Sequence, residues 1–170
     1  MSRLQTDYVD IGMLHFVDTQ EDYARVFQSE ILPYAQRLKE SGVIRAIGMS
    51  SHDPVAALQA VGSGSIDVLM FSINPAYDLL PEDTEIDDLF KAESFQNETL
   101  LGINPIRDEL YKTCEATGCA ITVMKSLGAG ALLHADTSPF GVALTVPQCI
   151  HYCLTRPAVA SVLVGSKSPD

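Results

Sequence analysis

The sequence predicts an α/β fold, a partial (β/α)8 barrel of five parallel strands that alternate with helices. Three observations predict it. Short apolar runs without polar alternation occur between amphipathic helical patterns, as in strands that are buried on both faces. Four of these runs end in polar residues, as expected where parallel strands end at a shared site. No Gly-x-Gly-x-x-Gly sequence follows the first run or occurs elsewhere, which argues against a doubly wound nucleotide-binding sheet.

The strands are expected where branched and apolar side chains gather in short runs bounded by turn residues. The first run is typical, because it reads Tyr-Val-Asp-Ile-Gly-Met-Leu and ends on the imidazole of His15. The five predicted strands are residues 8–15, 43–49, 66–72, 120–124 and 159–164.

The helices are expected from apolar residues at helical spacing and from signals at the helix ends. The pattern over 21–41 predicts one amphipathic helix that ends at Gly42. Asp53 caps a helix that begins with Pro54, where the missing N–H costs nothing, and runs to about residue 61. Two further helices are predicted at residues 105–118 and 145–156.

A complete (β/α)8 barrel needs eight strands and about 250 residues. This chain has 170 residues, so we expect residues 1–170 to form a single incomplete, truncated barrel domain. Unpaired strand edges favour association. The sequence therefore predicts a homo-oligomer, or a partner such as the missing barrel half, that covers the edges of the sheet.

Composition limits the partners. The chain is 46% hydrophobic and carries a net charge of −11, whereas neutralising phosphates requires clustered Lys and Arg. We therefore expect no nucleic-acid partner and no anionic membrane partner. No run reaches the roughly 18 consecutive apolar residues of a membrane span, and the N-terminus lacks the pattern of a signal peptide, so we expect a cytoplasmic protein.

Cysteine and histidine spacing predicts no metal site. The thiols lack Cys-x-x-Cys spacing and suit small packing roles in a reducing compartment. The histidines other than His15 have no partner at ligand spacing and are interpreted as incidental. These residues are Cys114, Cys119, Cys149, Cys153, His52, His134 and His151.

Residues 78–104 interrupt the alternation of strands and helices, and acidic side chains are concentrated between residues 82 and 88. Loops of this length in compact domains are usually functional. We predict a lid or substrate loop on the rim, with a short helix at 86–91. A solvated acidic excursion is the alternative.

The polar strand ends are expected to share one rim. Right-handed crossovers place the carboxyl ends of parallel strands on the same side of the sheet. His15, Ser50–Ser51 and Lys125–Ser126 follow three of the predicted strands, and Gly165-Ser166-Lys167 follows the last. These residues are the candidates for a common site around one cavity.

Four segments together resemble consecutive landmarks of the aldo-keto reductase family, in matching order and spacing. They are Leu-Gln-Thr-Asp-Tyr-Val-Asp at 4–10 with Leu14-His15, Gly-Val-Ile-Arg-Ala-Ile-Gly-Met-Ser-Ser at 42–51, Lys-Ser-Leu-Gly-Ala-Gly at 125–130, and Pro-Ala-Val-Ala-Ser-Val-Leu-Val-Gly at 157–165. The resemblance implies the last five strands of a barrel that reduces aldehydes or ketones with NADP(H). It also implies that His15 is catalytic, because His15 matches the family's histidine. The family's catalytic Asp, Tyr and Lys have no counterpart in this chain.

The resemblance implies a set of cofactor contacts. Ser50 and Ser51 match a Ser-Asn pair that hydrogen-bonds the nicotinamide carboxamide, although Ser51 departs from Asn. Met70 stands where the family has a Gln that contacts the same carboxamide, and Asn74 is a candidate replacement. The residues that match the cofactor loops are Lys125, Ser126, Leu127, Gly128, Gly130, Gly165, Ser166 and Lys167.

Two alternatives to a reductase stay open. The absent Asp, Tyr and Lys favour a non-catalytic or vestigial half-barrel that acts as a binding or interaction module. A different barrel enzyme, an aldolase that uses Lys125 as a Schiff-base amine, would need a desolvated lysine of lowered pKa.

Overall fold

The chain forms one open sheet of five parallel strands. The computed structural model describes residues 4–79 and 102–165. The spatial order of the strands is β1-β2-β3-β4-β5, and every neighbouring pair is parallel. The strands are β1 (Val9–Leu14), β2 (Ile44–Ser51), β3 (Val68–Ser72), β4 (Ala120–Met124) and β5 (Val159–Val162). The predicted α/β fold class is confirmed.

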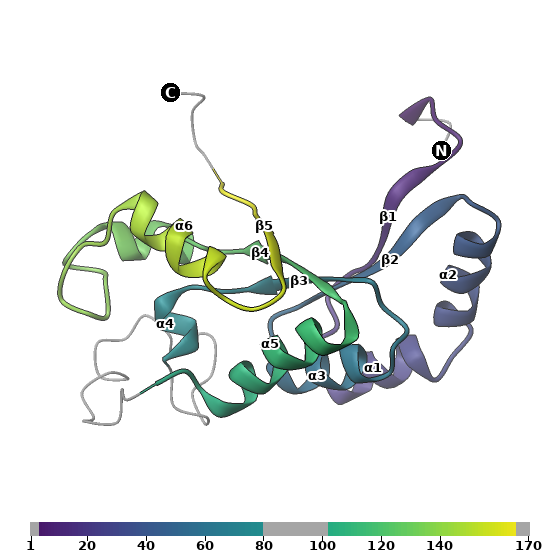
Figure 1. Cartoon of the computed structure of the whole chain (residues 1–170), viewed down its shortest axis with the longest axis horizontal. Coiled ribbons are helices and arrows are strands. Elements are labelled where there is room, and N and C mark those ends of the chain that lie inside the picture. Colours follow the sequence, from purple (N-terminus) through teal and green to yellow (C-terminus); the bar gives the residue numbers. More distant parts are fainter. Residues whose placement is uncertain (1–3, 80–101, 166–170) are drawn as a thin grey trace.

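The strand order distinguishes a barrel arc from a doubly wound sheet. In a doubly wound sheet the order reverses at a switch point, whereas here each strand lies beside its predecessor in sequence. Figure 1 shows α3 and α5 beneath the sheet, while β1 and β5 rise on either side of its opposite face. This arrangement is an incomplete ring of βα units.

The helices agree with the sequence pattern except at residues 21–41, and two short elements, at Pro75–Asp78 and Gly128–Leu133, were not predicted. The predicted helix over 21–41 is wrong as a single helix, because it is broken at residues 28–30 into α1 and α2. Pro33 is the reason: it cannot donate a hydrogen bond to the carbonyl of Ser29, so the helix must restart with Pro33 in its first turn. The helices are α1 (Gln20–Phe27), α2 (Ile31–Glu40), α3 (Pro54–Gly62), α4 (Pro75–Asp78), α5 (Pro105–Thr117) and α6 (Val146–Leu154), with a 3-10 element η4 (Gly128–Leu133).

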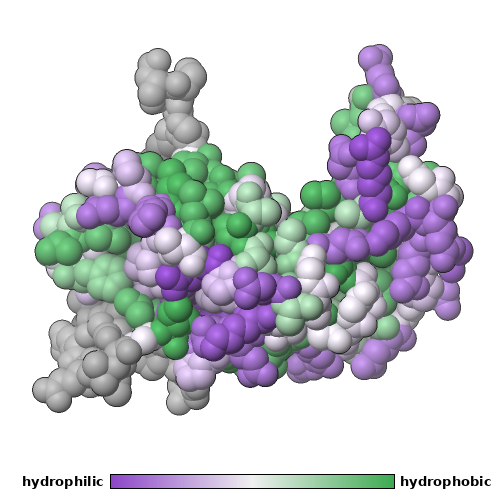
Figure 2. Space-filling model, in the orientation of Figure 1, coloured by the Kyte–Doolittle hydropathy of each residue, from purple (hydrophilic) through white to green (hydrophobic). Residues whose placement is uncertain are grey.

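The core lies between the sheet and its helices, where Ile47, Leu69 and Ile121 are at most 2% exposed. The opposite face is more open: Ile11 is 42% exposed and Met13 37%. Gly48 lies against them, and a Cβ at this position would lie 2.2 Å from the sulfur of Met13, so the methionine side chain would have to move. Figure 2 shows apolar side chains on both sides of the hollow between the β1 and β5 arms.

A buried charge cluster joins α4, α5 and α6. The Asp78 carboxylate is fully buried and accepts hydrogen bonds from Arg107 Nε at 2.8 Å, Tyr111 Oη at 2.5 Å and Tyr152 Oη at 2.9 Å. Burial raises the pKa of Tyr111 well above its ordinary value, so its hydroxyl keeps its proton and donates. Arg107 also donates to the carbonyl of Ser72 at the end of β3. We call these four side chains, Asp78, Arg107, Tyr111 and Tyr152, the Asp78 clasp.

Most of the predicted acidic rim loop at 78–104, including the helix expected at 86–91, lies outside the described residues. Its two ends are described, and they meet where the N–H of Asn104 donates to the carbonyl of Asp78 at 2.7 Å. No helix in the described ranges is both long and apolar enough to cross a membrane.

Asp67 links α2 to β2 just before β3 begins. Lys39 Nζ lies 2.7 and 2.6 Å from its two carboxylate oxygens, and the N–H of Ile47 donates to one of them at 2.8 Å. Burial alone would raise the pKa of Asp67, but the hydrogen bonds from Lys39 and Ile47 outweigh it and hold the pKa below the ordinary 3.8.

The Asp67→Asn variant should have a flatter stability profile on the acid side. Because the pKa of Asp67 is lower in the folded chain than in the unfolded chain, its carboxylate stabilises the fold above about pH 4. That contribution is lost as the pH falls through the lowered pKa of Asp67 in the folded chain. The ion pair is partly exposed, so we expect a loss of at most about 1 kcal/mol at neutral pH. Urea unfolding across this pH range measures the effect, and parallel profiles for variant and wild type would contradict the assignment.

The Arg107→Met variant should lose about 3–5 kcal/mol of unfolding free energy, because it leaves the Asp78 carboxylate buried without its cation. Adding Asp78→Asn removes that charge and should restore part of the loss. Denaturant unfolding of both variants tests this. If the double variant is less stable than Arg107→Met, the buried charge of Asp78 is not the cause of the loss in Arg107→Met.

Candidate functional site

All five strands end at the same edge of the sheet, which we call the carboxyl-terminal rim. His15 follows β1 and is exposed, Ser50 and Ser51 end β2, and Lys125 follows β4. The segment through Gly165 follows β5. Parallel pairing thus brings those predicted site residues that the structure describes to one rim, but in two separate groups.

The first group surrounds Ser50 at the ends of β1 and β2. The N–H of Phe16 donates to Ser50 Oγ at 2.8 Å, and the N–H of Val17 donates to the Ser50 carbonyl at 3.0 Å. Phe16 has a φ of +62°, which is unusual for a side chain with a Cβ. Buried Ser50 therefore fixes the turn that follows His15, and its hydroxyl proton is still available to a ligand.

Ser51 is tied into the neighbouring loop. Its hydroxyl lies 3.1 Å from both Asp18 Oδ1 and the Asp53 carbonyl, and it accepts the N–H of Asp53 at 3.1 Å. Asp18 also binds His52, whose Nδ1 lies 2.9 Å from Asp18 Oδ2. His52 thus has a structural partner that sequence spacing did not reveal, because Asp18 lies on a different loop.

The second group lines a cavity between the loop after β4 and the segment after β5. Its volume is about 820 Å³, within the range of small-molecule sites. Five of the predicted cofactor residues line it, namely Lys125, Ser126, Leu127, Gly130 and Gly165. Of the other six lining residues, Ala129 lies within the predicted loop at 125–130, and His134 had been interpreted as incidental. The remaining four, Ala131, Leu133, Thr137 and Leu163, were not predicted. His15, Ser50, Ser51 and Gly128 are not among the lining residues.

Ser126 is the most informative residue of this cavity. It is 1% exposed, and its hydroxyl has no hydrogen-bond partner within the described part of the chain. An unpaired buried hydroxyl costs about 1–3 kcal/mol, so its presence on a cavity wall suits a ligand that supplies the missing partner. The amide and phosphate oxygens of a nicotinamide dinucleotide are acceptors of this kind.

The loop around Ser126 has an unusual backbone. Lys125 has a φ of +59° and Ala129 of +55°, and Gly128 and Gly130 are also left-handed. The N–H groups of Gly128 and Gly130 donate to the carbonyls of Lys125 and Leu127 at 2.9 Å. These two amides are therefore used inside the loop, and the glycines serve its conformation.

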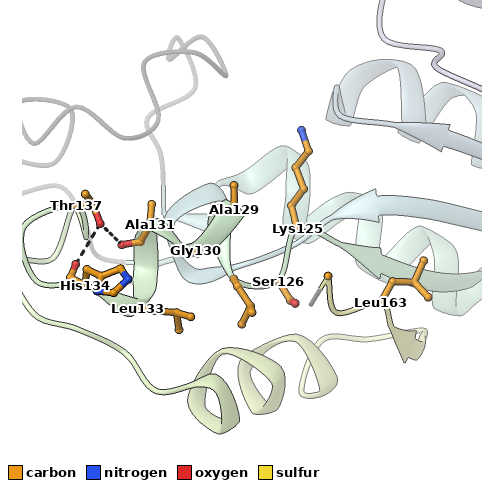
Figure 3. Close-up of a pocket in the computed structure, with 11 residues that line it drawn as sticks. Lys125, Ser126, Ala129, Gly130, Ala131, Leu133, His134, Thr137 and Leu163 are labelled. Carbon is orange, nitrogen blue, oxygen red and sulfur yellow. Dashed lines mark hydrogen bonds between the residues drawn. The ribbon is translucent and has the colours of Figure 1, made fainter. Parts of the chain in front are cut away.

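A turn that contains His134 and Thr137 lines the far end of the cavity. Thr137 Oγ1 donates to the Ala131 carbonyl at 2.8 Å, and Figure 3 shows Thr137 and His134 together at that end. Lys125 is exposed and extends away from the other lining residues. That placement conflicts with an aldolase, which needs a desolvated amine.

Other predicted residues lie elsewhere. Met70 is half-buried in β3, paired with Ser50, and the side chain of Asn74 is bound to the Lys125 carbonyl and the N–H of Tyr77. Ser166 and Lys167 lie outside the described residues.

All four cysteines are buried and free of disulfides. Burial raises the pKa of Cys153 to about 12, so that thiol is protonated at neutral pH. The described ranges contain no group of three potential metal ligands.

Comparison with known proteins places this geometry in a family. The sequence profile of the Aldo/keto reductase family matches residues 1–144. The uncharacterized oxidoreductase YqkF of Bacillus subtilis is 26% identical over 171 residues, which cover 98% of this chain and 53% of YqkF. The chain thus spans about half the length of this relative.

Solved structures show the same fold. The holo form of aldo-keto reductase AKR11C1 from Bacillus halodurans superposes with a TM-score of 0.66 at 22% identity, over 98% of this chain and 54% of that protein. An aldo/keto reductase from Klebsiella pneumoniae in complex with NADP and acetate gives a TM-score of 0.55 at 16% identity, over 96% and 51% of the two chains. With the family profile covering most of its length, the chain belongs to the aldo/keto reductase family.

Proposed function

We propose that this chain binds NADP(H) in the cavity beside β4 and β5 and contributes His15 to a site that reduces a small aldehyde or ketone. The observation that carries the proposal is the buried, unpartnered hydroxyl of Ser126 on the cavity wall. Its position at the carboxyl-terminal rim supports the proposal, because barrel enzymes hold their sites there. The Klebsiella pneumoniae structure in complex with NADP supports the choice of cofactor.

Each residue has a defined task in this proposal. The nicotinamide cofactor, when bound, supplies the hydride. His15 hydrogen-bonds the carbonyl oxygen and so favours the negative charge that develops there. Ser50 accepts from the Phe16 N–H and directs its own proton toward the carboxamide. Ser126 provides a contact inside the cavity.

A non-catalytic binding module is the second candidate. It is favoured by the single match to the family's four catalytic residues, and by the hydroxyl of Ser51, which is bound within its own loop. In that case the edge strands β1, which carries exposed Ile11 and Met13, and β5 serve to bind the remaining strands of a barrel or another chain. For both candidate functions we propose that the chain is located in the cytoplasm, where four unpaired thiols are stable.

The Ser126→Ala variant should change affinity and stability in opposite directions. Without cofactor, removing an unsatisfied hydroxyl should leave the unfolding free energy unchanged or slightly higher. The dissociation constant for NADPH should rise about three- to tenfold, as expected for one lost hydrogen bond. Fluorescence titration and denaturant unfolding measure the two effects. Ser63→Ala at the end of α3 is the control, and an unchanged affinity in Ser126→Ala would argue against the cavity as the cofactor site.

The purified chain should bind NADPH without appreciable carbonyl reduction, because it holds no match to the family's Tyr proton donor. NADPH fluorescence reports binding, and loss of NADPH absorbance with a panel of aldehydes and ketones reports turnover.

His15→Ala should leave the NADPH affinity within about twofold, because His15 is proposed to contact the substrate and not the cofactor. Substantial turnover that persists in His15→Ala would contradict the role of His15. No binding at millimolar NADPH would favour the module without a cofactor.

A further inference from the structure

Asn74 connects β3 to the cofactor loop. It follows the end of β3, caps α4 and is fully buried. Its Oδ1 accepts the N–H of Tyr77 at 2.9 Å, and its Nδ2 donates to the carbonyl of Lys125 at 2.9 Å. The N–H of Ile73 donates to the carbonyl of Met124, the last residue of β4, at 3.2 Å. Asn74 therefore extends the contact between β3 and β4 one residue beyond their backbone hydrogen bonds.

The carbonyl that Asn74 holds belongs to a strained residue. Lys125 has a φ of +59°, and a left-handed conformation costs roughly 5- to 30-fold in population for a residue with a Cβ. In the described part of the chain, two side chains donate to backbone carbonyls of the 125–133 loop, Asn74 at its start and Thr137 near its end. Of these two side chains, only Asn74 binds the carbonyl of the strained residue before Ser126, and that carbonyl also accepts the N–H of Gly128 at 2.9 Å.

We propose that Asn74 is a positioning residue for the cofactor loop. Its amide, together with the N–H of Gly128, holds the Lys125 peptide in the left-handed conformation, and this conformation places Ser126 on the wall of the cavity. The inference rests on the proposed function of that cavity and assigns Asn74 no contact with the cofactor. It replaces the expectation that Asn74 substitutes for the family's Gln, because the Asn74 side chain is fully buried and its amide is bound to Lys125 and Tyr77.

Asn74 is itself fixed from the other side. The N–H of Asp78 donates to the Asn74 carbonyl at 3.0 Å, and the Asp78 carboxylate is held by Arg107, Tyr111 and Tyr152. The Asp78 clasp therefore supports α4, α4 places Asn74, and Asn74 sets the backbone of Lys125.

A set of paired variants tests the proposal on the full chain. Asn74→Ser keeps a good helix cap but is too short to reach Lys125. It is measured in two backgrounds that both lack the lysine side chain. Lys125→Ala keeps the backbone strain, whereas Lys125→Gly removes it. Asn74→Ser should weaken NADPH binding about tenfold in the Ala background and less than about threefold in the Gly background. An equal loss in both backgrounds, or no loss in either, would overturn the proposal.

A control variant and a second measurement separate the positioning role of Asn74 from a loss of folding and from a failure of the proposed function. Thr19→Ala removes the cap that the Thr19 side chain provides to α1 and should leave the NADPH affinity unchanged. Hydrogen–deuterium exchange of residues 125–133 needs no cofactor, so it stays informative even if the wild-type chain fails to bind NADPH and the proposed function is wrong. Asn74→Ser should speed exchange there in the Ala background and not in the Gly background. Asn74→Asp, which keeps the cap and the side-chain size, replaces Asn74→Ser if the latter does not fold, and equal exchange in both backgrounds would again reject the positioning role.

Discussion

The buried carboxylate of Asp78 is the constraint on which the carboxyl-terminal rim depends. A charge with no exposure is tolerated only when donors surround it, and its donors come from α5 and α6, two elements far apart in the sequence. Satisfying one carboxylate therefore fixes how α4, α5 and α6 meet at the end of β3. The Asp78 backbone joins the same point to the start of α5 through Asn104. The positions of the loop after β4 and of the cavity follow from this junction.

The rim holds two groups that the sheet keeps apart. His15 and Ser50 lie at the ends of β1 and β2, whereas the cavity lies beyond β4 and β5, with β3 between them in the sheet. A molecule that contacts both groups has to extend along the rim across the end of β3. Half-buried Met70 lies in the middle of β3, paired with Ser50, and buried Asn74 follows the end of β3. Met70 has no amide, and the amide of Asn74 is buried and bound to Lys125 and Tyr77. If one ligand does bridge the groups, the β3 position gives it an apolar contact in place of the family's Gln.

Sequence patterns predicted the strands well because buried parallel strands are continuous apolar runs, and β4 was placed at its observed bounds. They predicted the helix at 21–41 poorly, because its apolar periodicity continues through the break that Pro33 imposes. Short α4 carries too few residues for periodicity to show.

In the site, the match at 125–130 located Ser126 and half of the cavity. His134 and Thr137 were missed because a 3-10 turn, rather than a sequence pattern, brings them to it. The pairs Asp18–His52 and Asn74–Lys125 join positions 34 and 51 residues apart, and no local spacing reveals such contacts.

Backbone strain is concentrated where ligands are expected. Of the five non-glycine residues with positive φ in the described ranges, Phe16, Lys125 and Ala129 lie in loops at the carboxyl-terminal rim. Strained residues persist only where surrounding contacts fix their conformation. In two of these loops, a buried polar side chain from the end of the neighbouring strand provides such a contact. Ser50 accepts the N–H of Phe16, and Asn74 donates to the carbonyl of Lys125. Each strained residue stands directly beside a candidate site residue, His15 in one case and Ser126 in the other. The same arrangement at both groups argues that the sheet uses buried side chains at its strand ends to set the direction of the residues that face a ligand.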